Sequence, residues 1–261
     1  MKNIIAFFFL ILSIGWPAHA ATDQKTIDFL EKINRYYYCL NREGLKNFSA
    51  DISISLTPEC EQALPETKTK KPFITTSNKL KFSVFCSSNS TPTITLIPPA
   101  SSGSAQFDSA VMKSGEMFRS MIEGATQTWT EQVFKPLHDQ QTYARGCVVQ
   151  KTANGFSVIN NGDQGTLTEY FDPQGTATGC SGTINGTSIS SKNSYSKTSK
   201  GLLATGYTAD IQGMNMAITF KYETVGGFWL LKSMLCKMTG PQLPGNNISF
   251  VLTFSKYKLN Q

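Results

Sequence analysis

Residues that carry chemistry are scarce in this sequence. It has two histidines among 261 residues, His19 near the start and His138 beside Asp139. No Gly-x-Ser-x-Gly sequence is present that would supply a serine nucleophile for such a histidine. No Cys-x-x-Cys pair is present, which argues against a zinc ribbon or a thioredoxin-like redox site. We therefore expect no catalytic residue, no metal site and no cofactor, and we expect His138 at the surface or at a helix end.

Charged residues are also few, at 16% of the chain, and the acids are scattered along it. The formal net charge is +6, and the only tight basic cluster is Lys68, Lys70 and Lys71, between two prolines. Binding of nucleic acid would need a denser basic face with interleaved aromatic residues, so we do not expect it. The charge is compatible with weak attraction to anionic lipid headgroups.

A long apolar run occurs only at the N-terminus. Lys2 precedes an almost unbroken apolar segment over residues 4–14, and Ala18-His19-Ala20 fits the small-x-small rule for cleavage. The pattern predicts a signal peptide over residues 1–20 and a mature chain that is exported to the periplasm or secreted. An uncleaved N-terminal anchor is the alternative. No later segment is apolar enough to span a membrane, so none is expected in the mature chain.

The six cysteines all follow the predicted cleavage point. Their even number in an exported chain predicts structural disulfides, although six cysteines allow 15 pairings and the sequence does not choose among them. The candidates are Cys39, Cys60, Cys86, Cys147, Cys180 and Cys236.

Two regions show helical periodicity. Over residues 23–41 apolar side chains recur at every third or fourth position, and Gly44 is a natural stop. A longer apolar stripe covers residues 107–137, and Gly124 is expected to kink it or split it into a helical pair. Its members are Phe107, Val111, Phe118, Ile122, Ala125, Trp129, Val133 and Leu137, bordered by Met112, Met117 and Met121.

Most of the remaining sequence alternates between apolar and polar residues, which predicts strands with one buried face. We expect them near residues 52–56, 80–86, 93–97, 156–158, 167–171, 202–211, 214–223, 228–238 and 247–257. Gln212-Gly213 and Gly226-Gly227 are short turns, and strands joined by such turns are antiparallel. Residues 57–77 are expected to form a loop, and residues 179–199 a flexible hairpin.

The order of these elements predicts one α+β domain over residues 21–261. Its sheet should be antiparallel and strongly curved, with the helices packed in its concavity.

Two stretches resemble the LolA/LolB superfamily of periplasmic lipoprotein carriers and related sensor domains. The first, residues 27–54, is a tyrosine-rich helix followed by Gly-Leu-Lys-Asn-Phe-Ser-Ala-Asp. The second, residues 221–260, contains Tyr-Glu-Thr-Val-Gly-Gly-Phe-Trp-Leu-Leu and ends on Phe-Ser-Lys-Tyr-Lys-Leu-Asn. The resemblance implies an incomplete barrel closed by a helical lid, and acyl chains of a lipoprotein or similar amphiphile held inside it.

The methionine-rich face of the second helical region is the candidate lid, since methionine adapts to irregular apolar ligands. We expect a non-catalytic protein whose partners are lipids or lipoprotein acyl chains, with an envelope protein as a further candidate. One alternative is a structural or sensor domain with a filled core that acts through protein contacts, and another is a secreted hydrolase. The expected ligand-binding residues are Phe118, Met121, Ile122 and Trp129 on the helix and Phe82, Val84 and Phe220 on strands.

Overall fold

The computed structural model describes residues 24–64, 66, 70–136, 147–162, 165–241, 243 and 246–260. The predicted signal peptide, its cleavage site and His138 lie outside the described residues. Within them no helix combines the length and the apolar character needed to cross a bilayer.

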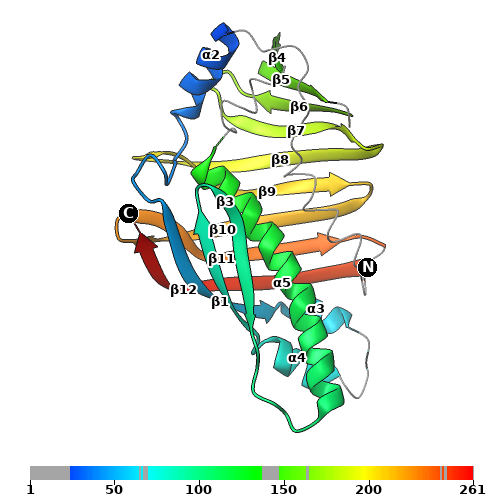
Figure 1. The fold of residues 1–261 in the computed structure, drawn as a ribbon. Helices are drawn as coiled ribbons and strands as arrows, with labels where there is room; N and C mark the ends of the chain where they lie inside the picture. The colour runs from blue at the N-terminus through cyan, green and yellow to red at the C-terminus, as the bar shows by residue number, and fades with distance from the viewer. Residues whose placement is uncertain are drawn as a thin grey trace.

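Four helices and twelve strands are described (Figure 1). The helices are α2 (Gln24–Asn34), α3 (Pro58–Ala63), α4 (Lys70–Ser77) and α5 (Ala105–Phe134). The strands are β1 (Asn47–Leu56), β2 (Lys81–Ser87), β3 (Ser90–Ile97), β4 (Cys147–Thr152), β5 (Gly155–Gly162), β6 (Gly165–Phe171), β7 (Ala177–Ile184), β8 (Thr187–Thr198), β9 (Gly201–Ile211), β10 (Met214–Val225), β11 (Phe228–Thr239) and β12 (Asn247–Asn260).

All twelve strands form one antiparallel sheet in the order β3-β2-β1-β12-β11-β10-β9-β8-β7-β6-β5-β4. The predicted antiparallel sheet is therefore confirmed, and it is open, with β3 and β4 as its two edges. Most neighbours are consecutive because two-residue turns join them. In the β7–β8 turn, Asn185 and Gly186 have φ of 50° and 77°, as a hairpin turn with two left-handed residues requires. The exception is β1, which pairs with β12 from Asn47↔Asn260 to Leu56↔Phe250 and so joins the two ends of the described chain.

Alternation along the strands produces one buried face. In β3, exposed and buried residues alternate from Thr91 to Ile97, and the buried Ile94 and Leu96 belong to the main core. Helix α5 runs diagonally across one face of the sheet in Figure 1, and its buried side chains join the same core. Gly115 allows a close approach to β3, because a Cβ there would lie 2.6 Å from the Leu96 Cδ2 atom. The main core therefore lies between α5 and the sheet.

A smaller core lies under α2, at the end of the sheet formed by β4–β7. Leu30 and Ile33 of α2 pack there with Val158 and Phe171. The Tyr37 hydroxyl donates to the Gly175 carbonyl at 2.9 Å and accepts from the Ala177 N–H at 2.6 Å. The segment after α2 is thereby fastened to the β6–β7 turn.

Three expectations about secondary structure were wrong. The first helix ends at Asn34, because the chain then turns to bond with β9 through Tyr38 N–H and Leu202 O. The second helical region is one continuous helix through Gly124. The expected loop at 57–77 contains α3 and α4. The expected hairpin at 179–199 is confirmed, since β7 and β8 pair from Gly179↔Lys192 to Ile184↔Thr187, and these strands also pair with β6 and β9.

The predicted disulfides are not formed, since all six cysteines are unpaired. Cys86 on β2 and Cys236 on β11 are separated by β1 and β12. Three steps between strands amount to roughly 14 Å, whereas a disulfide needs Cα atoms within about 7 Å of each other. Cys147 on β4 and Cys180 on β7 are likewise three strands apart. Their positions in the ladder keep these thiols apart.

Candidate functional site

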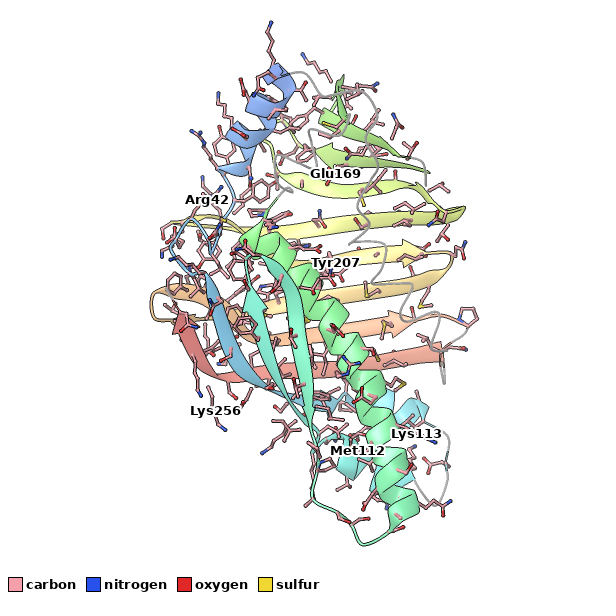
Figure 2. The ribbon with its side chains drawn as sticks, viewed as in Figure 1. Arg42, Met112, Lys113, Glu169, Tyr207 and Lys256 are labelled. Carbon is pink, nitrogen blue, oxygen red and sulfur yellow. The ribbon has the colours of Figure 1, made fainter. Side chains whose placement is uncertain are left out.

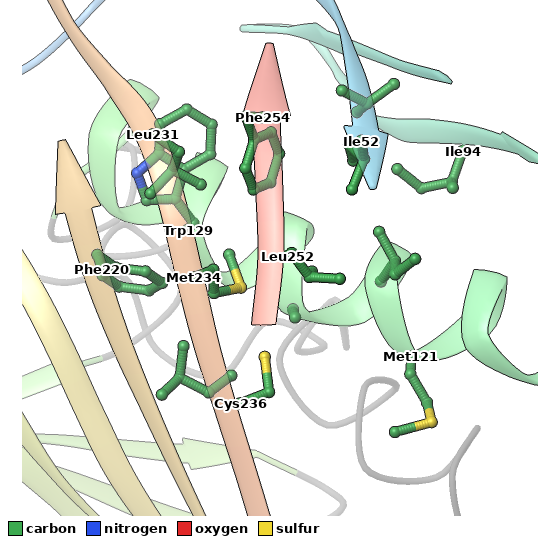
Figure 3. Close-up of a cluster of buried hydrophobic side chains, with 14 of the residues drawn as sticks. Ile52, Ile94, Met121, Trp129, Phe220, Leu231, Met234, Cys236, Leu252 and Phe254 are labelled. Atoms are coloured by element: carbon green, nitrogen blue, oxygen red, sulfur yellow. The ribbon is translucent and has the colours of Figure 1, made fainter. Parts of the chain in front are cut away.

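The structure brings the seven predicted ligand-binding side chains into one cluster. Four come from α5, two from β2 and one from β10, and all belong to the main core (Figure 3). None is more than 4% exposed. The seven are Phe118, Met121, Ile122, Trp129, Phe82, Val84 and Phe220.

The contacts of this cluster are made with protein. The Trp129 ring meets Phe48 edge-on at 5.8 Å, and its indole N–H donates to the Tyr222 hydroxyl at 3.1 Å. That hydroxyl donates in turn to the Ala204 carbonyl at 2.6 Å, which leaves no polar group unpaired along this chain of bonds. Phe118 packs edge-on against Phe250 at 6.0 Å. In this structure the predicted cluster is packed core.

Methionine is concentrated in the same layer. The sequence has eight methionines, one of which is Met1, and the other seven all lie in or against the main core. Thioether side chains are flexible and polarizable, so a layer rich in them can repack around a guest at low cost. The seven are Met112, Met117, Met121, Met214, Met216, Met234 and Met238.

A hollow of about 500 Å³ opens where the loop from β3 enters α5. This volume is within the range of about 300–1,000 Å³ typical of small-molecule pockets. Its apolar wall ends at Val111, a buried member of the main core, and at Phe107, which packs against that core. The hollow therefore reaches the layer between α5 and the sheet. Its apolar lining is Ile97, Pro98, Pro99, Ala100, Phe107 and Val111.

The polar lining of this hollow is formed by Lys79, Lys81, Ser102 and Asp108. Both lysines are exposed. Asp108 lies in the first turn of α5 and accepts from the Ser101 hydroxyl at 2.6 Å and from the Ser102 N–H at 3.0 Å. These hydrogen bonds, that of Ser101 first, lower the pKa of the Asp108 carboxyl. The carboxylate thus ties the loop to the start of the helix.

Sequence reasoning found only part of this hollow. Phe107 and Val111 belong to the predicted apolar stripe, but no role was predicted for Lys79 or Lys81. The sequence did contain a signal for these lysines. Lys79 and Lys81 stand at the start of one strand of a hairpin, and Pro98-Pro99 follows the end of its second strand. The lysines are therefore expected beside the segment that leads into the helix. That β2 and β3 bring Lys81 opposite Ile97 follows only from their register.

A second hollow, of about 450 Å³, lies on the sheet across β8–β11. Its lining includes Lys192, Thr208, Asp210, Asn215 and Lys237, together with Ala209, Met216 and Ala217. Thr208 on β9 pairs with Ala217 on β10. Ala217 follows the buried Met216, and successive side chains of a strand point to opposite faces. Thr208 and Ala217 therefore lie on the face opposite the core.

No family model matches the chain, and no curated protein and no solved structure matches it significantly. Among the described residues, no three side chains of His, Cys, Asp or Glu come close enough together to hold a metal ion. The site is therefore characterised by its shape and its lining.

Proposed function

We propose that this is an exported, non-catalytic binding protein that holds the acyl chain of a lipid, a lipoprotein or a similar amphiphile. In this proposal α5 is a lid that packs in the concavity of the sheet. The observation that carries it is the hollow at the start of α5, whose apolar wall runs from Pro98 to the buried Val111. The N-terminal apolar segment of the sequence supports the proposed export.

The methionine layer adds a route inward. A guest that enters at Phe107 meets Met112 and Met117, which are partly buried and pack against the core. Figure 2 places Met112 on the half of α5 near the hollow. Each acyl methylene removed from water is worth about 0.8 kcal/mol, so a chain of several methylenes can offset the cost of displacing these side chains.

The test is a titration of the mature protein with a fluorescent fatty acid. In the variant Ala100→Trp an indole fills the hollow, and we expect the affinity to fall about tenfold or more, or about 1.4 kcal/mol. Ala110→Trp is the matched control, because Ala110 is an exposed residue of α5 outside the lining. Equal affinity in the two variants would contradict binding in this hollow.

The second candidate function is a structural or sensor domain that acts through protein contacts. The full packing of the predicted ligand-binding cluster favours it, with Trp129 and Ile122 at 0% exposure. Under this alternative, the wild-type protein takes up no fatty acid. Ile122→Ala then behaves as a simple core truncation and lowers the free energy of unfolding by about 2–5 kcal/mol.

A further inference from the structure

The charges around the hollow define the ligand more closely than its shape does. Among the lining residues, Lys79, Lys81 and Asp108 carry charge. Two ammonium groups against one carboxylate leave a single positive charge. Within the described part of the chain neither lysine forms an ion pair. The hollow therefore has an apolar wall and a rim with the charge to balance one anion.

Four backbone donors around the start of α5 are already used. The N–H of Ser102 bonds to Asp108, that of Gly103 to the Ser101 hydroxyl, and that of Ser104 to the Ser102 hydroxyl. The Phe107 N–H bonds to the N-capping Ser104 hydroxyl at 3.4 Å. A phosphate group at a helix N-terminus is normally held by backbone N–H groups that have no other partner. Here Asp108 and the serine hydroxyls occupy these four N–H groups, whereas neither lysine ammonium group has an ion-pair partner among the described residues.

We propose that the ligand is a single-chain amphiphile with a carboxylate headgroup, a fatty-acid anion, whose headgroup binds between Lys79 and Lys81. This inference rests on the proposed function and adds the headgroup to it. A carboxylate carries one negative charge, which matches the net charge of the lining, and its two oxygens match two ammonium donors. A doubly charged phosphate would bring excess negative charge close to Asp108. The acyl chain lies along Pro98, Phe107 and Val111.

The experiment compares two competitors that differ only in their headgroup, dodecanoate and dodecanol, in displacing a fluorescent fatty acid from the mature protein. In the double variant Lys79→Met and Lys81→Met we expect dodecanoate to bind about tenfold more weakly and dodecanol to change by less than about twofold. Lys79→Arg with Lys81→Arg should restore dodecanoate binding. High salt should weaken dodecanoate binding selectively, because the lysines are exposed and their charges are screened.

Lys113→Met is the matched control. Lys113 is exposed on α5 and outside the lining, so this variant should bind both competitors like the wild type (Figure 2). Equal affinity of the wild type for dodecanoate and dodecanol, or an unchanged dodecanoate affinity in the double variant, would overturn the headgroup assignment and leave the acyl-binding function intact. Failure of the wild type to bind either compound would refute both proposals.

Discussion

The cysteine side chains behave as small apolar residues. Cys86 and Cys236 are at most 2% exposed, and burial raises the pKa of both thiols because a thiolate there would lose its hydration. Cys39 is also buried and directs its thiol to the Phe134 carbonyl at the end of α5, at 3.2 Å. A thiol that is neutral and screened from solvent reacts slowly.

We expect a thiol reagent to leave Cys86 and Cys236 unmodified in the native protein, since the reagent needs an accessible thiolate. After denaturation without a reductant, all six cysteines should react. Counting the label by mass spectrometry before and after denaturation tests both statements. A denatured protein with two or more cysteines blocked would contradict the unpaired arrangement and favour disulfides.

Helix α5 rests on β3 through a glycine. A Cβ at Gly115 would lie 2.6 Å and 3.2 Å from the two δ-carbons of Leu96 and 3.6 Å from Leu80 Cδ2. Both leucines are buried, so they can give way only a little. Because Gly115 has no Cβ, α5 can approach the edge strand β3 closely at this point. This approach also sets the width of the layer that the hollow enters.

We expect Gly115→Leu to destabilise the protein. Removing a glycine from a helix gains about 0.8–1 kcal/mol, but overpacking a filled core costs about 1–3 kcal/mol, and the second effect is the larger where Leu96 is this close. Urea unfolding should show a net loss of up to about 2 kcal/mol. Ala110→Leu, at an exposed position of the same helix, should stay within about 0.5 kcal/mol of the wild type. Equal stability of the two variants would exclude close α5–β3 packing.

Buried phenols are spread over the whole molecule. Desolvation raises the pKa of Tyr38 to about 12, and it also raises the pKa of Tyr37, Tyr195, Tyr207, Tyr222 and Tyr257. Two of these tyrosines, Tyr37 and Tyr38, follow α2, and the other four lie on β8, β9, β10 and β12. Four of these hydroxyls, those of Tyr37, Tyr38, Tyr222 and Tyr257, bond to backbone groups of other segments, as Tyr257 does with the Leu231 carbonyl at 2.6 Å.

The protein should therefore lose stability at alkaline pH. In the unfolded chain tyrosine ionises near pH 10, while in the folded protein these phenols stay neutral to higher pH. A raised folded pKa contributes stability that is complete below about pH 10 and is lost as the pH rises through the folded value. For Tyr38 the window runs from about pH 10 to about 12. Urea unfolding at several pH values measures this slope, and a free energy of unfolding independent of pH in this window would refute it.

Local periodicity predicted much of this fold. The apolar stripe from Phe107 to Val133 identified α5, and alternating residues identified most of the strands. Residues 179–199 were predicted as a hairpin, which is confirmed, and were expected to be flexible because serine, threonine and asparagine are abundant in them. Their buried members, Ile184 and Ile189, find a partner in Ile211 of β9, which is distant in sequence. Pairing with β6 on one side and with β9 on the other holds this segment in the sheet, although its local composition predicts flexibility.

Which residues face inward could be predicted from local sequence, because burial follows a period of two in a strand and of about 3.6 in a helix. Turns could be predicted in the same way, through pairs such as Gln212-Gly213, whose φ values are 52° and 81°. Three features could be seen only in the folded protein: β1 pairs with β12, the six cysteines are unpaired, and Lys79 and Lys81 line a hollow that ends at Val111. These features depend on contacts between residues far apart in the chain, and such contacts leave no period in the sequence.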